Sequence, residues 1–201
     1  MIDEGYVKFE SRWKQTDSLE CPQIKELIRW RAPLYSAGLI GHFADLDIGF
    51  GNLSARTGRH GLFVISGTQT GHLPELRKEH FSLVTGFDLG ANIVHSQGAA
   101  EPSSESMTHA MLYALDSAIS AVVHIHSDAL WLALKGRVPT TDERVAYGTP
   151  GMAKEFARLS NETDFSETGI AVMAGHEGGL IGTGTSVEEA AMRLLSLHQN
   201  H

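Results

Sequence analysis

The chain has 201 residues, of which 42% are hydrophobic and 20% charged, a composition typical of one globular domain over residues 1–201. Its formal net charge of −8 argues against a protein that grips the phosphate backbone of nucleic acid. The single cysteine, Cys21, cannot form a disulfide within the chain, and the sequence has neither a signal peptide nor an apolar run of about 18 residues. We therefore expect a cytoplasmic protein with no membrane partner.

The N-terminal half predicts a helix followed by short strands. Residues 22–39 place apolar side chains, including Ala32 and Tyr35, at spacings of three and four, the period of an amphipathic helix. Residues 41–61 are rich in glycine and predict strands joined by tight turns. Further strands are expected at 62–66, 82–89 and 91–97. The last two, separated by a turn sequence, predict a β-hairpin.

The C-terminal half alternates helices with strands. Residues 104–117 have the apolar spacing of a helix, with Ser104 as its expected N-cap, and 121–126 predict a strand. Beyond a loop at 135–150, we expect a short helix at 151–160, strands at 169–174 and 178–183, and a helix from Ser186. Such alternation, with two hairpins, predicts an α/β domain around a mixed, mostly antiparallel sheet.

Three histidines have the arrangement of a metal site. Because residues two apart on a strand share a face, His124 and His126 can reach one ion, and imidazole suits zinc. Two histidines on a solvated strand face would give the same pattern. His176 follows an apolar strand and precedes two glycines, so it offers a third ligand, although an ordinary turn histidine would look alike. Three histidines leave one zinc coordination position open, as in catalytic sites.

Glu105 is the candidate catalytic carboxylate. It lies in the first turn of the predicted helix, where the helix dipole alone would favour a carboxylate. Beside a metal it could instead move a proton, because apolar surroundings tune a carboxyl pKa toward the working pH. His109, one turn later, either supports this site or is an exposed helical histidine.

A second group of residues indicates an anion site. Short donors from turns are offered by Asn52, Ser66, Gly67, Ser103 and Ser104. Helix N-termini and glycine-flanked amides bind phosphate without arginine or lysine, which agrees with an acidic chain. Ordinary turn and capping chemistry is the alternative interpretation.

Five motifs in this order resemble the class II aldolase/adducin family, and the resemblance spans roughly residues 22–198. They are GNLSAR at 51–56, ISGTQTG at 65–71, SSE at 103–105, VVHIHS at 122–127 and AGHEGGL at 174–180. The resemblance implies a three-layer αβα sandwich and a homotetramer with active sites at subunit interfaces. It also implies that His124, His126 and His176 bind Zn²⁺ and that Glu105 both visits the metal and transfers the proton. The five short donors would then form a substrate-phosphate pocket.

The activity implied is that of a zinc-dependent lyase of aldolase type. Such an enzyme makes or breaks a carbon–carbon bond in a phosphorylated ketose or related hydroxy-carbonyl compound, through an enediolate that the metal stabilises. Dehydratases and 4-epimerases of the family are alternatives, although the epimerases generally have aspartate where Glu105 stands. A non-catalytic adducin-like binding module is another alternative, but loss of metal ligands should mark it. The stretch between His126 and Tyr147 lacks the family's tyrosine-bearing segment, so Tyr147 or a residue of the C-terminal tail would have to supply the second proton.

Overall fold

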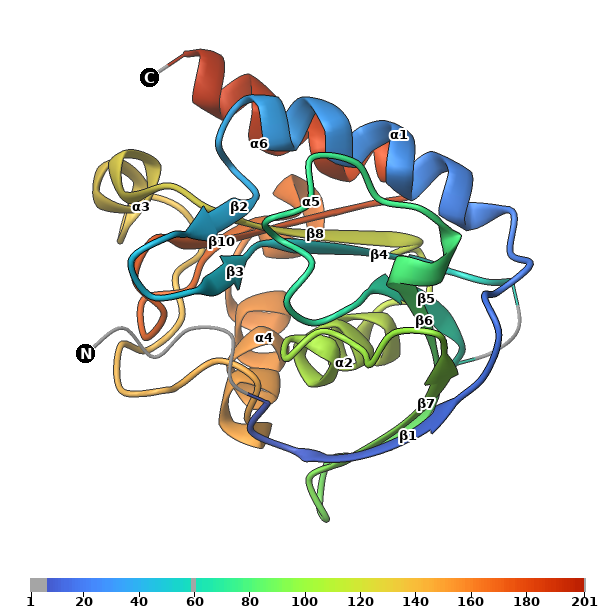
Figure 1. Ribbon diagram of the computed structural model, residues 1–201. Helices are drawn as coiled ribbons and strands as arrows, with labels where there is room; N and C mark the ends of the chain where they lie inside the picture. The colour runs from blue at the N-terminus through green and yellow to red at the C-terminus, as the bar shows by residue number, and fades with distance from the viewer. Residues whose placement is uncertain (1–6, 59–60, 201) are drawn as a thin grey trace.

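The computed structural model describes residues 7–58 and 61–200 and is built around an eight-stranded sheet (Figure 1). The strand order is β1-β7-β6-β5-β4-β8-β10-β9. The strands run over β1 Glu10–Gln15, β4 Asn52–Arg56, β5 Phe63–Ser66, β6 Phe81–Asp88, β7 Ile93–Gly98, β8 Ala121–His126, β9 Ile170–Val172 and β10 Gly179–Gly184. A separate hairpin joins β2 Gly41–Phe43 to β3 Ile48–Phe50.

Strand pairing confirms a mixed, mostly antiparallel sheet. In the described part of the chain, β1 pairs with β7 in parallel, and the other neighbours pair antiparallel. The predicted hairpins are present as β6–β7 and β9–β10. Strand β1 was not predicted, because its partner β7 lies about 80 residues away and a local pattern carries no record of such pairing.

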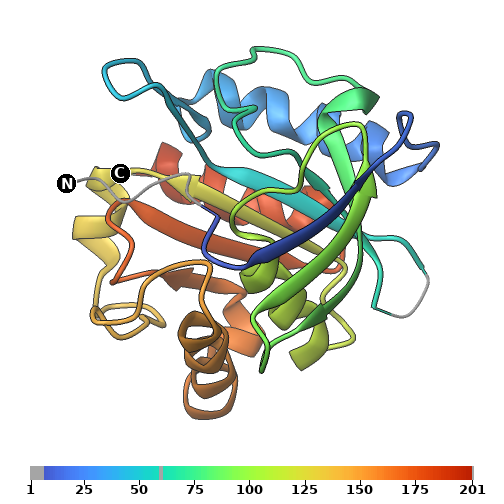
Figure 2. The ribbon, with the colours of Figure 1, turned by 60° about the horizontal axis from the view of Figure 1, so that its bottom comes forward.

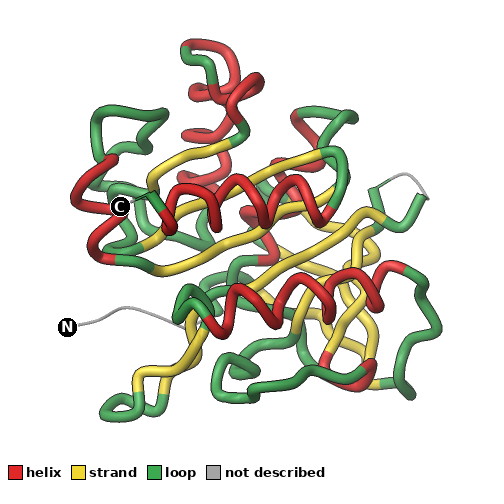
Figure 3. Tube along the Cα trace, turned by 90° about the horizontal axis from the view of Figure 1, so that it is seen from above, coloured by secondary structure: helices red, strands yellow, loops and turns green. Residues whose placement is uncertain are grey.

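Helices cover both faces of the sheet. They are α1 Gln23–Ser36, α2 Ser106–Leu115, α3 Asp128–Leu134, α4 Pro150–Glu162, α5 Phe165–Thr168 and α6 Val187–Gln199, with a 3₁₀ turn η1 at Lys78–His80. Helices α1 and α6 lie side by side and share one apolar core with α3 (Figure 3), whereas α2, α4 and α5 contribute to a second core on the opposite face (Figure 2). The expected three-layer αβα sandwich is confirmed. None of the described helices is both long enough and apolar enough to cross a bilayer.

The buried stripe of helix α1 begins with the expected Ile24 and Leu27 and then departs from the one expected. Its buried residues are Ile24, Leu27, Arg31 and Leu34, whereas Ala32 is exposed. The helix also ends at Ser36, because Gly38 takes a left-handed φ of 72° and turns the chain toward the sheet. An arginine therefore occupies a position that the helical period assigns to the core.

Helix α2 begins at Ser106 with Glu105 at the N-cap, so the expectation of Ser104 as N-cap was wrong. The Ser103 hydroxyl accepts a hydrogen bond from the Glu105 amide (3.3 Å) just before the helix begins, and the Glu105 side chain makes no capping hydrogen bond. Helix α3 was not predicted, because its seven residues are too few to show a helical period. Ser127 caps it by accepting from the Leu130 amide (3.3 Å).

Candidate metal centre

Strand β8 and the turn between β9 and β10 bring three histidines together. His124 and His126 lie two residues apart on β8, and all six residues of that strand are buried. His176 is held in a tight turn in which its amide donates to the Met173 carbonyl (3.0 Å) and its carbonyl accepts from the Gly179 amide (2.8 Å). A Cβ at Gly179 would lie 2.5 Å from the His176 ring, so glycine is required for this close approach.

The three imidazoles point their Nε2 atoms at one another. The distances are 3.1 Å between His124 and His126, 3.0 Å between His126 and His176, and 3.2 Å between His176 and His124. Two nitrogen ligands of a tetrahedral zinc ion stand about 3.3–3.4 Å apart, close to these separations. The histidines therefore form a group that can hold a metal ion.

The surroundings keep two of these imidazoles, those of His124 and His176, in the form that binds metals. The His124 Nδ1 lies 3.1 Å from the Leu180 carbonyl oxygen, which fixes the proton on Nδ1 and leaves the Nε2 lone pair toward the centre. Burial, followed by repulsion from His126, holds the pKa values of His124 and His176 well below the usual range. Both rings are therefore neutral at physiological pH.

Glu105 lies beside this group. Its carboxylate is 1% exposed, and Oε1 stands 3.8 Å from the His176 Nε2. That separation is longer than a hydrogen bond but short enough for both groups to face one ligand. The Glu105 carbonyl accepts from the His109 amide, and His109 itself is fully buried, with Nδ1 2.7 Å from the Ser54 hydroxyl. Burial lowers the pKa of His109 to about 3, so this histidine is a neutral internal support.

A polar pocket opens next to the histidines. Four of the five predicted anion-binding residues line it, namely Asn52, Gly67, Ser103 and Ser104. Ser66 lies behind the wall: its hydroxyl accepts from the Leu53 amide (3.3 Å) and its carbonyl accepts from the Ser103 amide (3.2 Å). Because Asn52 on β4 pairs with His124 on β8, the pocket and the histidine group are neighbours.

The remaining pocket wall was missed from the sequence. It is made by Gly49 of strand β3, by Gly51 just after that strand, and by residues 68–71 of the loop after β5. The ISGTQTG motif contains most of that loop, but only Ser66 and Gly67 were assigned from it. These are glycines and loop residues with no charged side chain, which is why the sequence did not single them out.

Aromatic rings enclose the histidines. The Tyr147 ring, 1% exposed, lies 4.3 Å from the His176 ring, and the Lys8 ammonium sits 3.7 Å above the Tyr147 ring centre. On the other side, Phe50 and Phe43 place their ring centres 5.5 and 6.4 Å from His126. These rings restrict water at the centre, which strengthens electrostatic interactions there.

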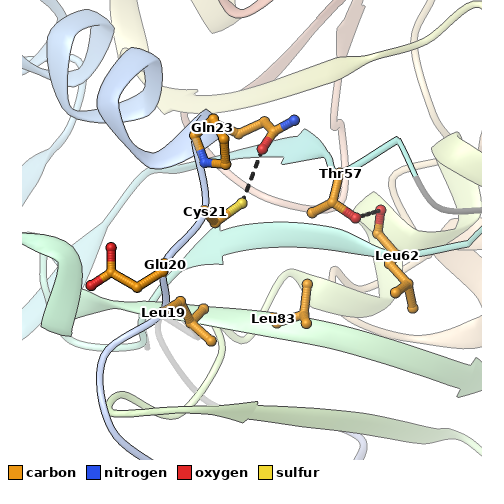
Figure 4. Close-up of a pocket in the computed structure, with 8 residues that line it drawn as sticks. Leu19, Glu20, Cys21, Gln23, Thr57, Leu62 and Leu83 are labelled. Atoms are coloured by element: carbon orange, nitrogen blue, oxygen red, sulfur yellow. Dashed lines mark hydrogen bonds between the residues drawn. The ribbon is translucent and has the colours of Figure 1, made fainter.

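A second hollow lies elsewhere, between the segment that precedes α1 and strands β4 to β6 (Figure 4). Its lining includes Leu19, Leu62 and Leu83, together with Cys21, whose thiol donates to the Gln23 side-chain oxygen (3.0 Å). None of its lining residues belongs to the histidine group or to the polar pocket. It is not part of the candidate centre.

Solved structures share this architecture. YgbL from Klebsiella pneumoniae, described as a putative aldolase/epimerase/decarboxylase, is 23% identical, with a TM-score of 0.65 over 88% of this chain and 85% of that chain. The L-fuculose-1-phosphate aldolase from Thermus thermophilus is 20% identical, with a TM-score of 0.62 and coverages of 87% and 88%. A sugar-phosphate aldolase from Thermotoga maritima is 16% identical, with a TM-score of 0.65 and coverages of 88% and 90%. At these identities the likeness shows the fold alone.

Sequence comparison is more specific at the level of the family. A search of curated proteins found no match. The family model of the class II aldolase and adducin N-terminal domain, however, matches residues 42–200, which include all three histidines, Glu105 and the polar pocket. The chain therefore belongs to the class II aldolase and adducin N-terminal domain family.

Proposed function

We propose that this protein is a metal-dependent lyase of aldolase type, acting on a phosphorylated ketose or a related hydroxy-carbonyl compound. The observation that carries the proposal is the convergence of three buried Nε2 atoms, 3.0–3.2 Å apart, beside the Glu105 carboxylate. A binding module has no need of such a group, because burying three imidazoles together with a carboxylate is costly without a ligand. The adducin-like alternative is therefore less well supported.

In this proposal, His124, His126 and His176 would hold Zn²⁺, and Glu105 would serve as an occasional further ligand. The ion would supply Lewis-acid stabilisation of the negative charge that develops on the substrate oxygens. Glu105 would remove or return the proton at the carbon next to the carbonyl group, since its carboxylate Oε1 lies 3.8 Å from the His176 Nε2. The buried aromatic rings exclude water from that proton.

The polar pocket would hold the substrate's phosphate group. Asn52, Gly67, Ser103 and Ser104 line it, and Ser66 supports its floor through the Leu53 amide and Ser103. We also propose a homotetramer with active sites at subunit interfaces, as in related aldolases. Sedimentation velocity should then give the mass of four chains. A mass of one chain at every protein concentration would contradict this part of the proposal.

The reaction is tested by product analysis. Zinc-loaded protein would be incubated with phosphorylated ketoses and their unphosphorylated analogues, and the products followed by NMR. Release of an aldehyde is expected. Loss of water or epimerisation without cleavage would instead identify the dehydratase or the 4-epimerase alternative. A metal-free protein that kept every activity or partner interaction would support the adducin-like module.

Removing the Asn52 side chain should weaken the binding of phosphorylated ligands more than the binding of unphosphorylated ones. Asn52 is 5% exposed and lines the pocket, and the donor that its side chain offers to a phosphate oxygen is the Nδ2 group. A hydrogen bond to a charged group contributes about 1.5–3 kcal/mol of binding free energy. Asn52→Ala should therefore lower the affinity for dihydroxyacetone phosphate by about 10- to 100-fold. Calorimetry against unphosphorylated dihydroxyacetone is the control. Equal weakening of both compounds would contradict a phosphate role.

A further inference from the structure

The hairpin β2–β3 has two different faces, and it projects from the body of the molecule (Figure 2). Because successive residues of a strand point to opposite faces, four positions of the hairpin share one face. They are Gly41, Phe43, Ile48 and Phe50. The opposite face holds Gly49, whose amide donates to the Gln69 side-chain oxygen (3.2 Å) of the loop after β5. The hairpin is therefore anchored to that loop by one face, which leaves the other face for the histidines.

Two aromatic rings of the first face contact His126, and we call Phe43 and Phe50 the aromatic pair. Their ring centres lie 4.5 Å apart, and they stand 6.4 and 5.5 Å from the centre of the His126 ring. A Cβ at Gly41 would lie 2.8 Å from the Phe50 ring, so the missing side chain leaves room for that ring across the hairpin. Both phenylalanines remain partly exposed. They therefore present apolar surface beside the metal centre.

Each imidazole of the centre has a different kind of neighbour. Asn52 of the polar pocket pairs with His124 on the adjacent strand. The Glu105 Oε1 lies 3.8 Å from the His176 Nε2. The aromatic pair lies beside His126, which at 8% is the most exposed of the three rings. A ligand held at the three Nε2 atoms would therefore meet polar groups near one ring, a carboxylate near the second and apolar surface near the third.

The hairpin offers little to an anionic group on the ligand. Residues 41–50 contain two aspartates and neither lysine nor arginine. The His42 side chain belongs to the face away from the aromatic pair, and its Nε2 lies 3.1 Å from the Asp47 Oδ1. Lys8 lies over Tyr147, beside a different imidazole of the centre. A carboxylate or phosphate next to the aromatic pair would therefore lose hydration without gaining a cationic partner from the hairpin.

We propose that the aromatic pair determines specificity, and that the substrate group it contacts is uncharged and apolar, such as a short alkyl or aryl group. A second anionic group at this end of the substrate is disfavoured. The inference rests on the proposed function only in taking this group to be the side chain of the aldehyde fragment. Phe43 and Phe50 contact that side chain directly, and the metal-binding rings do not select it.

Hydroxamates test the aromatic pair without any reaction, because the hydroxamate group can bind a zinc ion with an open position while its substituent is varied. The probes are acetohydroxamate, benzohydroxamate and 4-carboxybenzohydroxamate, the last of which adds only a carboxylate to the ring. Calorimetry on the full, zinc-loaded wild-type chain should give about tenfold weaker binding of the carboxylate derivative than of benzohydroxamate. Equal binding of these two probes would overturn the inference.

Phe50→Ser should lower the affinity for benzohydroxamate about three- to tenfold, because an aromatic contact and apolar surface are lost. The affinity for acetohydroxamate and the zinc content should stay nearly unchanged, which a general folding defect would not allow. Phe50→Leu restores an apolar side chain and should recover part of the affinity. Benzohydroxamate binding that Phe50→Ser leaves unchanged would contradict contact with this ring.

Phe43→Lys should shift the preference toward the anionic probe. A cation at this partly exposed position should raise the affinity for 4-carboxybenzohydroxamate, relative to benzohydroxamate, about two- to fivefold. The matched control is Met192→Lys, which adds the same charge at an exposed apolar position of α6 and should leave the ratio unchanged. The same ratio in Phe43→Lys as in the wild type would contradict the assignment.

Failure of the inference is distinguishable from failure of the proposed reaction. If the protein releases an aldehyde, but wild type and Phe50→Ser bind benzohydroxamate equally, the inference is overturned and the proposed function stands. If the expected preference is found in a protein that cleaves no ketose, the reaction is overturned and the role of the aromatic pair stands.

Discussion

Glu105→Gln is expected to slow proton exchange at the carbon next to the substrate carbonyl by about 10²- to 10⁴-fold, while the protein keeps its metal. The carboxamide has nearly the same shape as the carboxylate but cannot accept a proton. The position is 1% exposed and 3.8 Å from the His176 Nε2, so water cannot readily replace the lost base. Deuterium incorporation from D₂O into dihydroxyacetone phosphate, followed by NMR, measures the rate.

The matched control is Glu188→Gln. Glu188 is exposed and lies in the first turn of α6, so this variant makes the same chemical change near another helix N-terminus. Its exchange rate should equal that of the wild type. An unchanged rate in Glu105→Gln, with normal metal content, would remove Glu105 from the proton-transfer step.

His124→Ala is expected to abolish stable metal binding. Loss of a group that only orients a metal-binding side chain lowers the metal affinity about 10–100-fold. Loss of the metal-binding side chain itself should lower it further. His124 is fully buried, and its Nε2 lies within 3.2 Å of both partner nitrogens, so no other side chain of the group can take over its place. Competition with a chelator measures the affinity.

The comparison for this variant is His95→Ala, which removes an exposed histidine from β7. That protein should bind metal as the wild type does. Circular dichroism would confirm that His124→Ala keeps its secondary structure. A folded His124→Ala protein with wild-type metal affinity would show that the ion binds elsewhere.

The sequence predicted those parts of the centre whose residues carry a distinctive side chain in a regular element. His124 and His126 follow from the two-residue period of a strand, and the glycine pair after His176 marks a tight turn. The convergence of His176 on β8 did not follow from local pattern. It depends on the pairing of β8 with β10. The local sequence offered His176 either as a third ligand or as an ordinary turn histidine, and the resemblance to a family favoured the ligand.

The wall of the pocket was harder to predict. Residues 69–71 line it from a loop whose conformation no local pattern predicts, and the position of Tyr147 against His176 depends on how a long loop packs. Arg31, which donates to two carbonyl oxygens of the first loop, did leave a signal. It falls in phase with Leu27 and Leu34, and a charged residue inside an apolar stripe indicates a buried charge with a specific partner. The predicted buried face included Ala32 and not Arg31, so the buried arginine was not predicted.

The most direct test of the metal centre is the metal content of the purified wild-type chain, measured by mass spectrometry before and after reconstitution with zinc. Three convergent imidazoles predict about one divalent ion per chain, and none in a variant that lacks all three rings. A wild-type protein that held no ion under either condition, or a triple variant that held as much as the wild type, would contradict the assignment on which the proposed chemistry depends.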